Sequence, residues 1–178
     1  MGLYISKAMT TAGLLQQLKR RSVPVQARGH ERGILHACTY KNTTPFVPPI
    51  HAGKVIKVYD GDTIHVASEV WPGQVYRFSI RMNGYDSAEM RTRDPAEKRA
   101  AIIARDALHA KVMGKIVTLK NVALEKYGRV LCDVFLDNES INQWMIDNHY
   151  GIVYDGGTKT VVDWDAYIQQ RISTPMLS

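Results

Sequence analysis

VYDGDTIHV, residues 58–66, places two carboxylates, Asp60 and Asp62, one residue apart between two apolar runs. Aspartate is depleted in β-strands, and two negative charges this close repel each other unless a cation neutralises them. Apolar and polar residues alternate on both sides of the pair, which is typical of strands with one buried face. The stretch therefore predicts two short strands with an acidic pair between them, and it raises the question of which cation the pair faces.

The alternation of apolar and polar residues recurs along the rest of the chain. It predicts five strands, at 54–59, 63–66, 75–82, 115–124 and 129–136. In the third of these, VYRFSIRM, Phe78 and Ile80 alternate with Ser79 and Arg81. The preceding Trp-Pro-Gly-Gln segment at 71–74 supplies a turn, so the second and third strands follow each other closely.

One helix is predicted between the third and fourth strands, at 95–112. Pro95 suits the first turn of a helix, where the missing N–H has no partner to lose. Ile103, Ala107 and Ala110 keep helical spacing inside this segment. The glycine that follows, at position 114, is the residue type that most often ends a helix.

Two more helices follow the last strand. Ser140 and Gln143 have the spacing of a capping box, which opens a helix that stops near Gly151. A last helix is expected at about 162–172. Its inward-facing residues are Trp164, Tyr167 and Ile168. The order of elements predicts an α+β fold, in which a small five-stranded β-barrel of the oligonucleotide-binding (OB) type carries about three helices.

The positive charge of the chain lies at its N-terminal end. The net charge is +6, and residues 1–50 hold seven basic residues against one acidic residue, whereas the remainder holds sixteen of each. Three prolines within residues 45–49 favour an extended spacer. We therefore expect a basic N-terminal extension with a proline-rich linker at 1–50 and a folded domain at 51–178. A basic arm favours phosphate-rich partners, either nucleic acid or an anionic membrane surface.

Acidic and basic residues gather in four short stretches at predicted strand ends and loops. These are residues 60–63, Arg81, residues 86–89 and residues 126–129. The carboxylates of Asp60, Asp62 and Asp86 suit a hard cation, Ca²⁺ above all. Guanidinium groups bind phosphate oxygens through paired hydrogen bonds, and a glutamate beside a metal and a phosphate can activate water as a general base. Together these groups are the parts needed to hydrolyse a phosphodiester.

These stretches resemble the staphylococcal nuclease (thermonuclease) family over about residues 55–172. The runs that carry the resemblance are VYDGDTI (58–64), IRMNGYDSAE (80–89), EKYGRVL (125–131) and SINQWMIDNHYG (140–151). An Asp-Gly-Asp triplet alone is common in turns, but four such runs in this order make a strong signal. The resemblance implies a Ca²⁺-dependent endonuclease, a phosphodiesterase that cuts DNA and RNA with little sequence preference and leaves 3′-phosphates.

The resemblance also assigns roles to individual residues. It implies that Ca²⁺ binds the carboxylates of Asp62 and Asp86 and the carbonyl of Ser87, with Asp60 close by in support. The implied catalytic residues are Arg81 at the scissile phosphate, Arg129 at the transition state and Glu89 as general base. The implied substrate-binding residues are Lys126 and Tyr127 along the terminal phosphate of the nucleotide and Tyr154 against the base or sugar.

Two positions depart from the usual pattern of the family. Ser87 stands where the family usually has threonine, which matters little if this residue binds the metal through its backbone. Ala88 stands where the family has proline. Losing the proline adds about 0.4–1 kcal/mol of unfolded-state freedom and lets Glu89 move more, so that we expect lower activity without its abolition.

Other functions of the same fold are alternatives. One is a nucleic-acid-binding module without turnover, and another is a structural or assembly protein, for example in a virus particle or on a membrane face. Gly2 and Ser6 match the N-myristoylation pattern, and Lys19, Arg20 and Arg21 could supply the second signal that a single acyl chain needs for membrane attachment. The sequence predicts an intracellular protein, free or peripheral on a membrane, with no signal peptide and no obligate protein partner.

Overall fold

The computed structural model describes residues 33–125, 127–158 and 161–173. The chain divides into two units between Thr44 and Pro45. In the described part of the first unit, residues 33–36 are helical. The lipidation pattern at Gly2 and most of the basic arm lie outside the described residues. No helix among the described residues combines the length and the apolar character that crossing a membrane requires.

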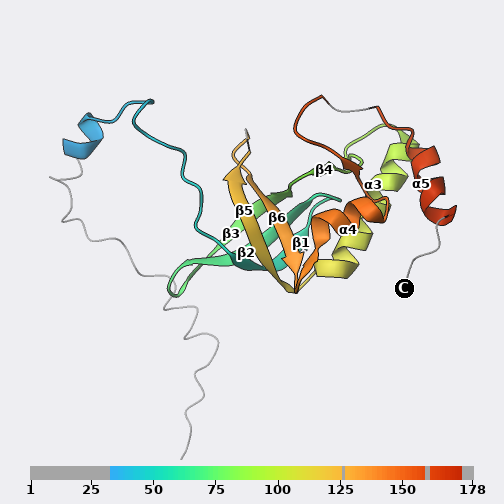
Figure 1. Ribbon diagram of the computed structural model, residues 1–178, viewed down its shortest axis with the longest axis horizontal. Helices are drawn as coiled ribbons and strands as arrows, with labels where there is room; N and C mark the ends of the chain where they lie inside the picture. Colours follow the sequence, from blue (N-terminus) through green and yellow to red (C-terminus); the bar gives the residue numbers. More distant parts are fainter. Residues whose placement is uncertain (1–32, 126, 159–160, 174–178) are drawn as a thin grey trace, which may run out of the picture. The chain divides into compact units, whose positions relative to one another are not determined.

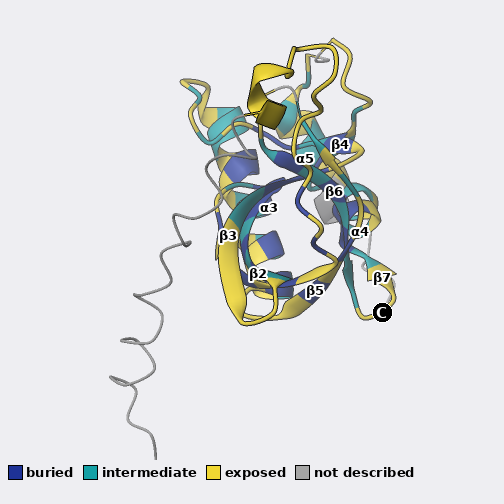
Figure 2. Cartoon of the chain, turned by 90° about the vertical axis from the view of Figure 1, so that its left-hand side faces the viewer, coloured by how far each residue is buried: buried dark blue, intermediate teal, exposed yellow. Residues whose placement is uncertain are grey.

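Five strands of the second unit close into a barrel, which Figure 2 shows end-on. They are β1 (Ala52–Val58), β2 (Thr63–Trp71), β3 (Gln74–Met82), β5 (Ile116–Leu124) and β6 (Val130–Leu136). Neighbours pair antiparallel in the order β3-β2-β1-β5-β6. A parallel pairing of β3 with β6, in which Ile80 lies opposite Val130, closes the ring. The predicted OB-type barrel is therefore confirmed (Figure 1).

The barrel interior is apolar because alternate residues of each strand point inward. Buried strand residues include Val55, Ile64, Val66, Ile80, Met82, Val117, Leu119, Val130, Cys132 and Val134. Ile50, which we placed in the extension, belongs to the same core and is 1% exposed. The backbone carbonyl of His51 accepts a hydrogen bond from the Leu119 N–H at 2.8 Å, so the chain joins the sheet before β1 begins. The folded unit thus starts upstream of the predicted boundary at residue 50.

Helix α3 (Pro95–Val112) covers one end of the barrel (Figure 1). The side chain of Asp94 caps its first turn by accepting a hydrogen bond from the Ala96 N–H at 2.8 Å. The buried face consists of Ala100, Ala101, Ala104, Leu108 and Val112. The three residues at helical spacing in the sequence lie beside this buried face, since Ile103 and Ala107 are half buried and Ala110 is exposed.

The last part of the chain forms two helices and two short pairings. Helix α4 (Ile141–Asp147) begins at the predicted cap, because the Ser140 hydroxyl accepts a hydrogen bond from the Gln143 N–H. It ends at Asp147, earlier than predicted. Strand β7 (Glu139–Ser140) pairs with β6, and strand β4 (Tyr85–Asp86) pairs with β8 (Ile152–Val153).

Helix α5 (Trp164–Ser173) lies beside α3 (Figure 1). Trp164 and Ile168 pack against a small cluster of buried alanines, Ala88, Ala100 and Ala101. The predicted inward face of this helix is therefore confirmed. Because Ala88 lies in the loop between β4 and α3, the packing of α5 against it also holds this loop in place. The loop carries part of the candidate site.

Candidate active site

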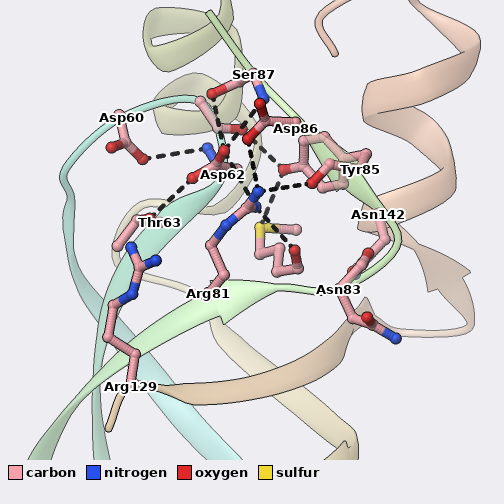
Figure 3. A network of polar contacts seen from close by, with 12 residues as sticks. Asp60, Asp62, Thr63, Arg81, Asn83, Tyr85, Asp86, Ser87, Arg129 and Asn142 are labelled. Atoms are coloured by element: carbon pink, nitrogen blue, oxygen red, sulfur yellow. Dashed lines mark hydrogen bonds and ion pairs between the residues drawn. The ribbon is translucent and has the colours of Figure 1, made fainter. Parts of the chain in front are cut away.

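Arg81, near the end of β3, is the centre of the acidic cluster (Figure 3). Its Nη1 lies 3.0 Å from Asp62 Oδ2, and its Nη2 lies 2.8 Å from Asp86 Oδ1. The same two nitrogens donate hydrogen bonds to the backbone carbonyls of Met82 and Tyr85, at 3.0 and 2.9 Å. The side chain is thus buried, with both terminal nitrogens bonded. It pairs with two carboxylates, one that precedes β3 in the sequence and one that follows it.

Asp62, at the end of the turn between β1 and β2, accepts hydrogen bonds at both carboxylate oxygens. Its Oδ1 accepts from the Thr63 hydroxyl at 2.9 Å, and its Oδ2 accepts from the N–H and the hydroxyl of Ser87 at 3.1 and 3.2 Å. Burial raises the pKa of Asp62 to about 6, although the Arg81 guanidinium opposes this effect. Asp60 lies beside it and accepts a hydrogen bond from the Asp62 N–H at 3.3 Å.

The acidic turn is held against two other elements. The hydroxyl of Tyr85 in β4 donates a hydrogen bond to the Gly61 carbonyl at 2.8 Å. Burial raises the pKa of Tyr85 well above its usual value, so the hydroxyl remains a donor. A Cβ atom at Gly61 would lie 2.8 Å from the Cβ atoms of Ala104 and Ser87, which explains why a glycine stands between the two aspartates. The turn at residues 59–62 therefore packs against α3 and the Ser87 loop only because Gly61 has no side chain.

Arg129 reaches the same turn from the loop between β5 and β6. Its Nε and Nη2 bind the two carboxylate oxygens of Glu125, at 2.6 and 2.8 Å. The hydrogen bond to Glu125 raises the pKa of Arg129, and the negative charges of Asp62 and Asp60 contribute to the shift. Figure 3 shows the side chain pointing toward Asp60, Asp62 and Thr63. Two arginines thus face one acidic turn, each with a carboxylate partner of its own.

Glu89 lies in the loop between β4 and α3, and α3 holds the backbone of this loop. The N–H of Glu89 donates a hydrogen bond to Glu97 Oε1 at 3.2 Å, and the Lys98 ammonium donates one to the Met90 carbonyl. The buried Ala88 belongs to one apolar cluster with Ala100 and Ala101 of α3, against which Trp164 and Ile168 of α5 pack. The freedom expected from the missing proline at position 88 is therefore restricted by these contacts.

A cavity of about 250 Å³ brings Glu89 together with two of the predicted metal ligands. It is lined by Asp86, Ser87, Glu89, Asp94, Glu97, Ile152, Val161, Val162 and Trp164. The carboxyl-bearing residues give this side of the site a negative character, whereas Arg81 lies on β3 and Arg129 in the loop that leads into β6. A water molecule and the group that deprotonates it could be accommodated in such a space.

Two of the three predicted substrate-binding residues, Tyr127 and Tyr154, lie in the described part of the chain. Lys126 lies outside the described residues. Tyr127 is 74% exposed, on the same tight turn as Arg129, where Gly128 adopts a φ of 80°. Tyr154 follows β8, and its hydroxyl donates to the Gly157 carbonyl in its own loop at 2.8 Å. Tyr127 is thus placed near Arg129, whereas the described contacts of Tyr154 do not join it to the cluster.

Some residues of the site were not among those predicted. Glu125 and Arg129 face each other across the turn between β5 and β6, where the Glu125 N–H donates a hydrogen bond to the Arg129 carbonyl, and opposite charges at the two ends of a short turn are a signal that could have identified the pair. The roles of Tyr85, Glu97 and Lys98 had no such signal, because each depends on contacts between elements that are distant in the sequence.

The chain was compared with known protein families and with curated proteins. Residues 79–170 match the family described as staphylococcal nuclease homologue, which is just over half of the chain. The match includes Arg81, Asp86 and Arg129 and begins after Asp60 and Asp62. No curated protein matches the chain. On the matched segment, together with the closed barrel, the chain belongs to the staphylococcal nuclease homologue family.

Proposed function

We propose that this protein is a Ca²⁺-dependent phosphodiesterase that hydrolyses DNA or RNA with little sequence preference. The observation that carries the proposal is the convergence of Asp62 and Asp86 on one guanidinium group. Arg129 faces the same acidic turn, and Glu89 shares a cavity with Asp86. In a chain of this family, these groups are the parts that phosphodiester hydrolysis requires.

The candidate ligands of the site are carboxylate and carbonyl oxygens, which suit Ca²⁺. Asp62 and Asp86 both lie within hydrogen-bond distance of Arg81, so their carboxylates are neighbours across one guanidinium group, which supports the proposal that they share an ion. Among the described residues, no three His, Cys, Asp or Glu side chains are placed to hold a metal by themselves. The proposed site therefore also uses the Ser87 carbonyl, and oxygen ligands of this mixed kind are the ones that Ca²⁺ prefers. When bound, Ca²⁺ supplies Lewis acidity toward a phosphate oxygen.

The protein residues perform the remaining steps of the proposed reaction. Glu89 would take a proton from water as the water oxygen forms a bond to phosphorus and the bond from phosphorus to the leaving oxygen breaks; the leaving oxygen would take a proton from solvent. Such general-base assistance contributes about 10²–10⁴ in rate. Arg129 and Arg81 stabilise the charge that grows on the phosphate oxygens. Because both terminal nitrogens of Arg81 are bonded within the protein, a phosphate contact through either of them requires it to give up part of its bonding to Asp62 or Asp86.

A second candidate function is binding of nucleic acid without turnover. It is favoured by the internal pairing of both arginines, Arg81 with two aspartates and Arg129 with Glu125. If these pairs persist when a ligand binds, the barrel still offers a surface for a polynucleotide, but each guanidinium has fewer donors for a phosphate and stabilises a transition state less.

Incubation of the full chain with plasmid and single-stranded DNA, in Ca²⁺ or in chelator, distinguishes the two candidates. A phosphodiesterase cuts both substrates in Ca²⁺ only, and its products carry 3′-phosphates. Binding of the same substrates that persists while Ca²⁺ produces no cleavage would leave the binding module as the function.

A further inference from the structure

The outer face of strands β1, β2 and β3 carries a row of cations. In the antiparallel ladder, Lys57 lies opposite His65, and Arg77 lies opposite Ala67, which in turn pairs with Lys54. Residues that are directly opposite share a face of the sheet, so these side chains point to the same side. We call this surface the cationic strip; it consists of Lys54, Lys57, His65 and Arg77.

The charges of the cationic strip are not neutralised by neighbouring acids. Among the described residues, Lys54, Lys57 and Arg77 are exposed and form no ion pair. The pKa of His65 is lowered by burial and by the positive charges of Lys57 and Arg77, which shows that these two cations act on the same point. Glu69 is the one acidic residue of the three strands, and its carboxylate accepts a hydrogen bond from the hairpin turn at Gly73.

An aromatic ring accompanies the cations. Tyr59 is 40% exposed, and the Lys57 ammonium lies 5.5 Å from the centre of its ring. The ring centre of Tyr59 lies 6.4 Å from that of His65. Positive groups that follow a backbone, together with an aromatic ring on which a base can stack, are the features by which proteins bind single-stranded nucleic acid without reading its sequence.

The cationic strip runs directly into the candidate active site. Arg77, Ser79 and Arg81 alternate along β3 and therefore share one face, with about 13 Å between the Cα atoms of the two arginines. Thr63, which binds Asp62, lies opposite Arg81 in the next strand. Figure 2 shows the exposed part of β3 on the outer wall of the barrel.

The two sides of the site differ in charge. The cavity is lined by residues that follow β3 in the sequence, among them Asp86, Glu89, Asp94 and Glu97. Their negative charges repel a polyanion. The cationic strip lies on the other side of Arg81, toward the start of β3. A nucleic-acid chain with one phosphate at Arg81 and Arg129 therefore meets attraction on the strip side and repulsion on the cavity side.

We infer that the cationic strip is a second binding site for single-stranded nucleic acid, which holds the phosphates that flank the one at Arg81. The inference rests on the proposed function for the identity of the ligand and deepens it by giving the direction in which the substrate lies. Lys57 and Arg77 bind backbone phosphates, and Tyr59 provides the stacking surface. Such contacts hold the chain in place without selecting a sequence.

Binding in chelator tests the inference without turnover. The probe is a fluorescently labelled 12-nucleotide single-stranded DNA, titrated with the full chain at several salt concentrations. We expect the double variant Lys57→Gln/Arg77→Gln to bind at least tenfold more weakly at low salt. Two lost phosphate contacts should also reduce the slope of log K against log salt by about 1.4. Both altered side chains are exposed, and thermal melting checks that the variant is folded.

The matched control is Arg99→Gln/Lys111→Gln, which removes two positive charges from α3 and leaves the cationic strip intact. Binding by this control should stay close to that of the unaltered chain, and the charge-conserving variant Lys57→Arg/Arg77→Lys should keep most of the salt slope. Equal losses in the Gln variants of the strip and of α3 would overturn the inference, since net charge would then explain both.

Cleavage in Ca²⁺ separates this inference from the proposed function. If the chain binds through the cationic strip but cuts nothing, the inference stands and the phosphodiesterase proposal fails. If the chain cuts DNA while the strip variant binds as well as the α3 control does, the proposed function stands and the inference fails.

Discussion

The guanidinium of Arg81 forms the links that bring the two separated carboxylates of the site together. The residue is 8% exposed, and its guanidinium bonds to two carboxylates and two backbone carbonyls. Burying an unpaired carboxylate is costly, whereas a guanidinium with four oxygen partners compensates for much of that cost. Asp62 of the stretch VYDGDTIHV therefore has a protein cation, the Arg81 guanidinium, as its partner.

This role predicts a large loss of stability for Arg81→Lys. A lysine ammonium keeps the charge but cannot bond to four oxygens in two directions. Breaking a buried pair typically costs about 3–5 kcal/mol, so we expect a loss of about 3 kcal/mol in the free energy of unfolding, measured with urea in chelator.

Arg99→Lys is the matched control for this substitution. Arg99 pairs with Asp165 on the surface, and an exposed pair of this kind contributes less than about 1 kcal/mol. If both substitutions destabilise the protein equally, Arg81 does not hold the site together.

Glu89→Gln separates catalysis from binding. Glutamine has the same shape but cannot take a proton, so kcat should fall by about 10²–10⁴ while affinity for an oligonucleotide in chelator changes little. The measurement is cleavage of a labelled oligonucleotide alongside its binding by anisotropy, with Asp106→Asn on α3 as a remote control. Comparable losses in kcat and in affinity would instead indicate a ligand or scaffold role for Glu89.

The sequence predicted which residues belong to the site better than it predicted their hydrogen-bond partners. The acidic pair and the arginines could be found because each lies in a short run with a recognisable order of residue types. The hydrogen bonds that occupy Arg81 could not, since they depend on where the carbonyls of Met82 and Tyr85 lie after folding. For the same reason the attachment of the Glu89 loop to α3 had no counterpart in the local sequence.

Between elements, the acidic turn, α3 and the Ser87 loop meet at Gly61. Gly61→Ala should destabilise the protein by about 1–3 kcal/mol, because the added Cβ lies 2.8 Å from two other Cβ atoms and one element must move. Urea unfolding measures the change. Gly33→Ala is the control, since no atom lies within 4 Å of a Cβ built there. A neutral Gly61→Ala would show that the turn is not packed as described.

The elements themselves were predictable to different degrees. The five barrel strands follow from alternation, which records the difference between a buried and an exposed face. Strands β4 and β8 have two residues each, too few to show any period. The buried face of α3 is rich in alanine, so it differs little in hydrophobicity from the sides of the helix, and sequence spacing alone did not single it out.

For the chain as a whole, the position of Ile50 predicts where the folded unit can be cut. A chain that begins at Pro45 keeps Ile50 in the core, whereas a chain that begins at His51 loses it. Loss of a buried isoleucine side chain costs about 2–5 kcal/mol, so the shorter chain should be less stable by this amount in urea unfolding.

Ile50→Ala in the full chain is the matched variant, because it removes the side chain without removing the arm. It should reproduce most of the difference between the two truncated chains. Equal stability of the chains that begin at Pro45 and at His51 would place the true boundary after residue 50.

The central claim is that Asp62 and Asp86 hold a Ca²⁺ ion at which a phosphodiester is cut. The most direct measurement is the rate of plasmid cleavage as a function of Ca²⁺ concentration, for the full chain and for Asp62→Asn. We predict that cleavage depends on Ca²⁺, stops in chelator, and needs a clearly higher Ca²⁺ concentration for half-maximal rate in the variant. Cleavage with the same Ca²⁺ requirement in both proteins, or no cleavage at any Ca²⁺ concentration, would contradict the claim.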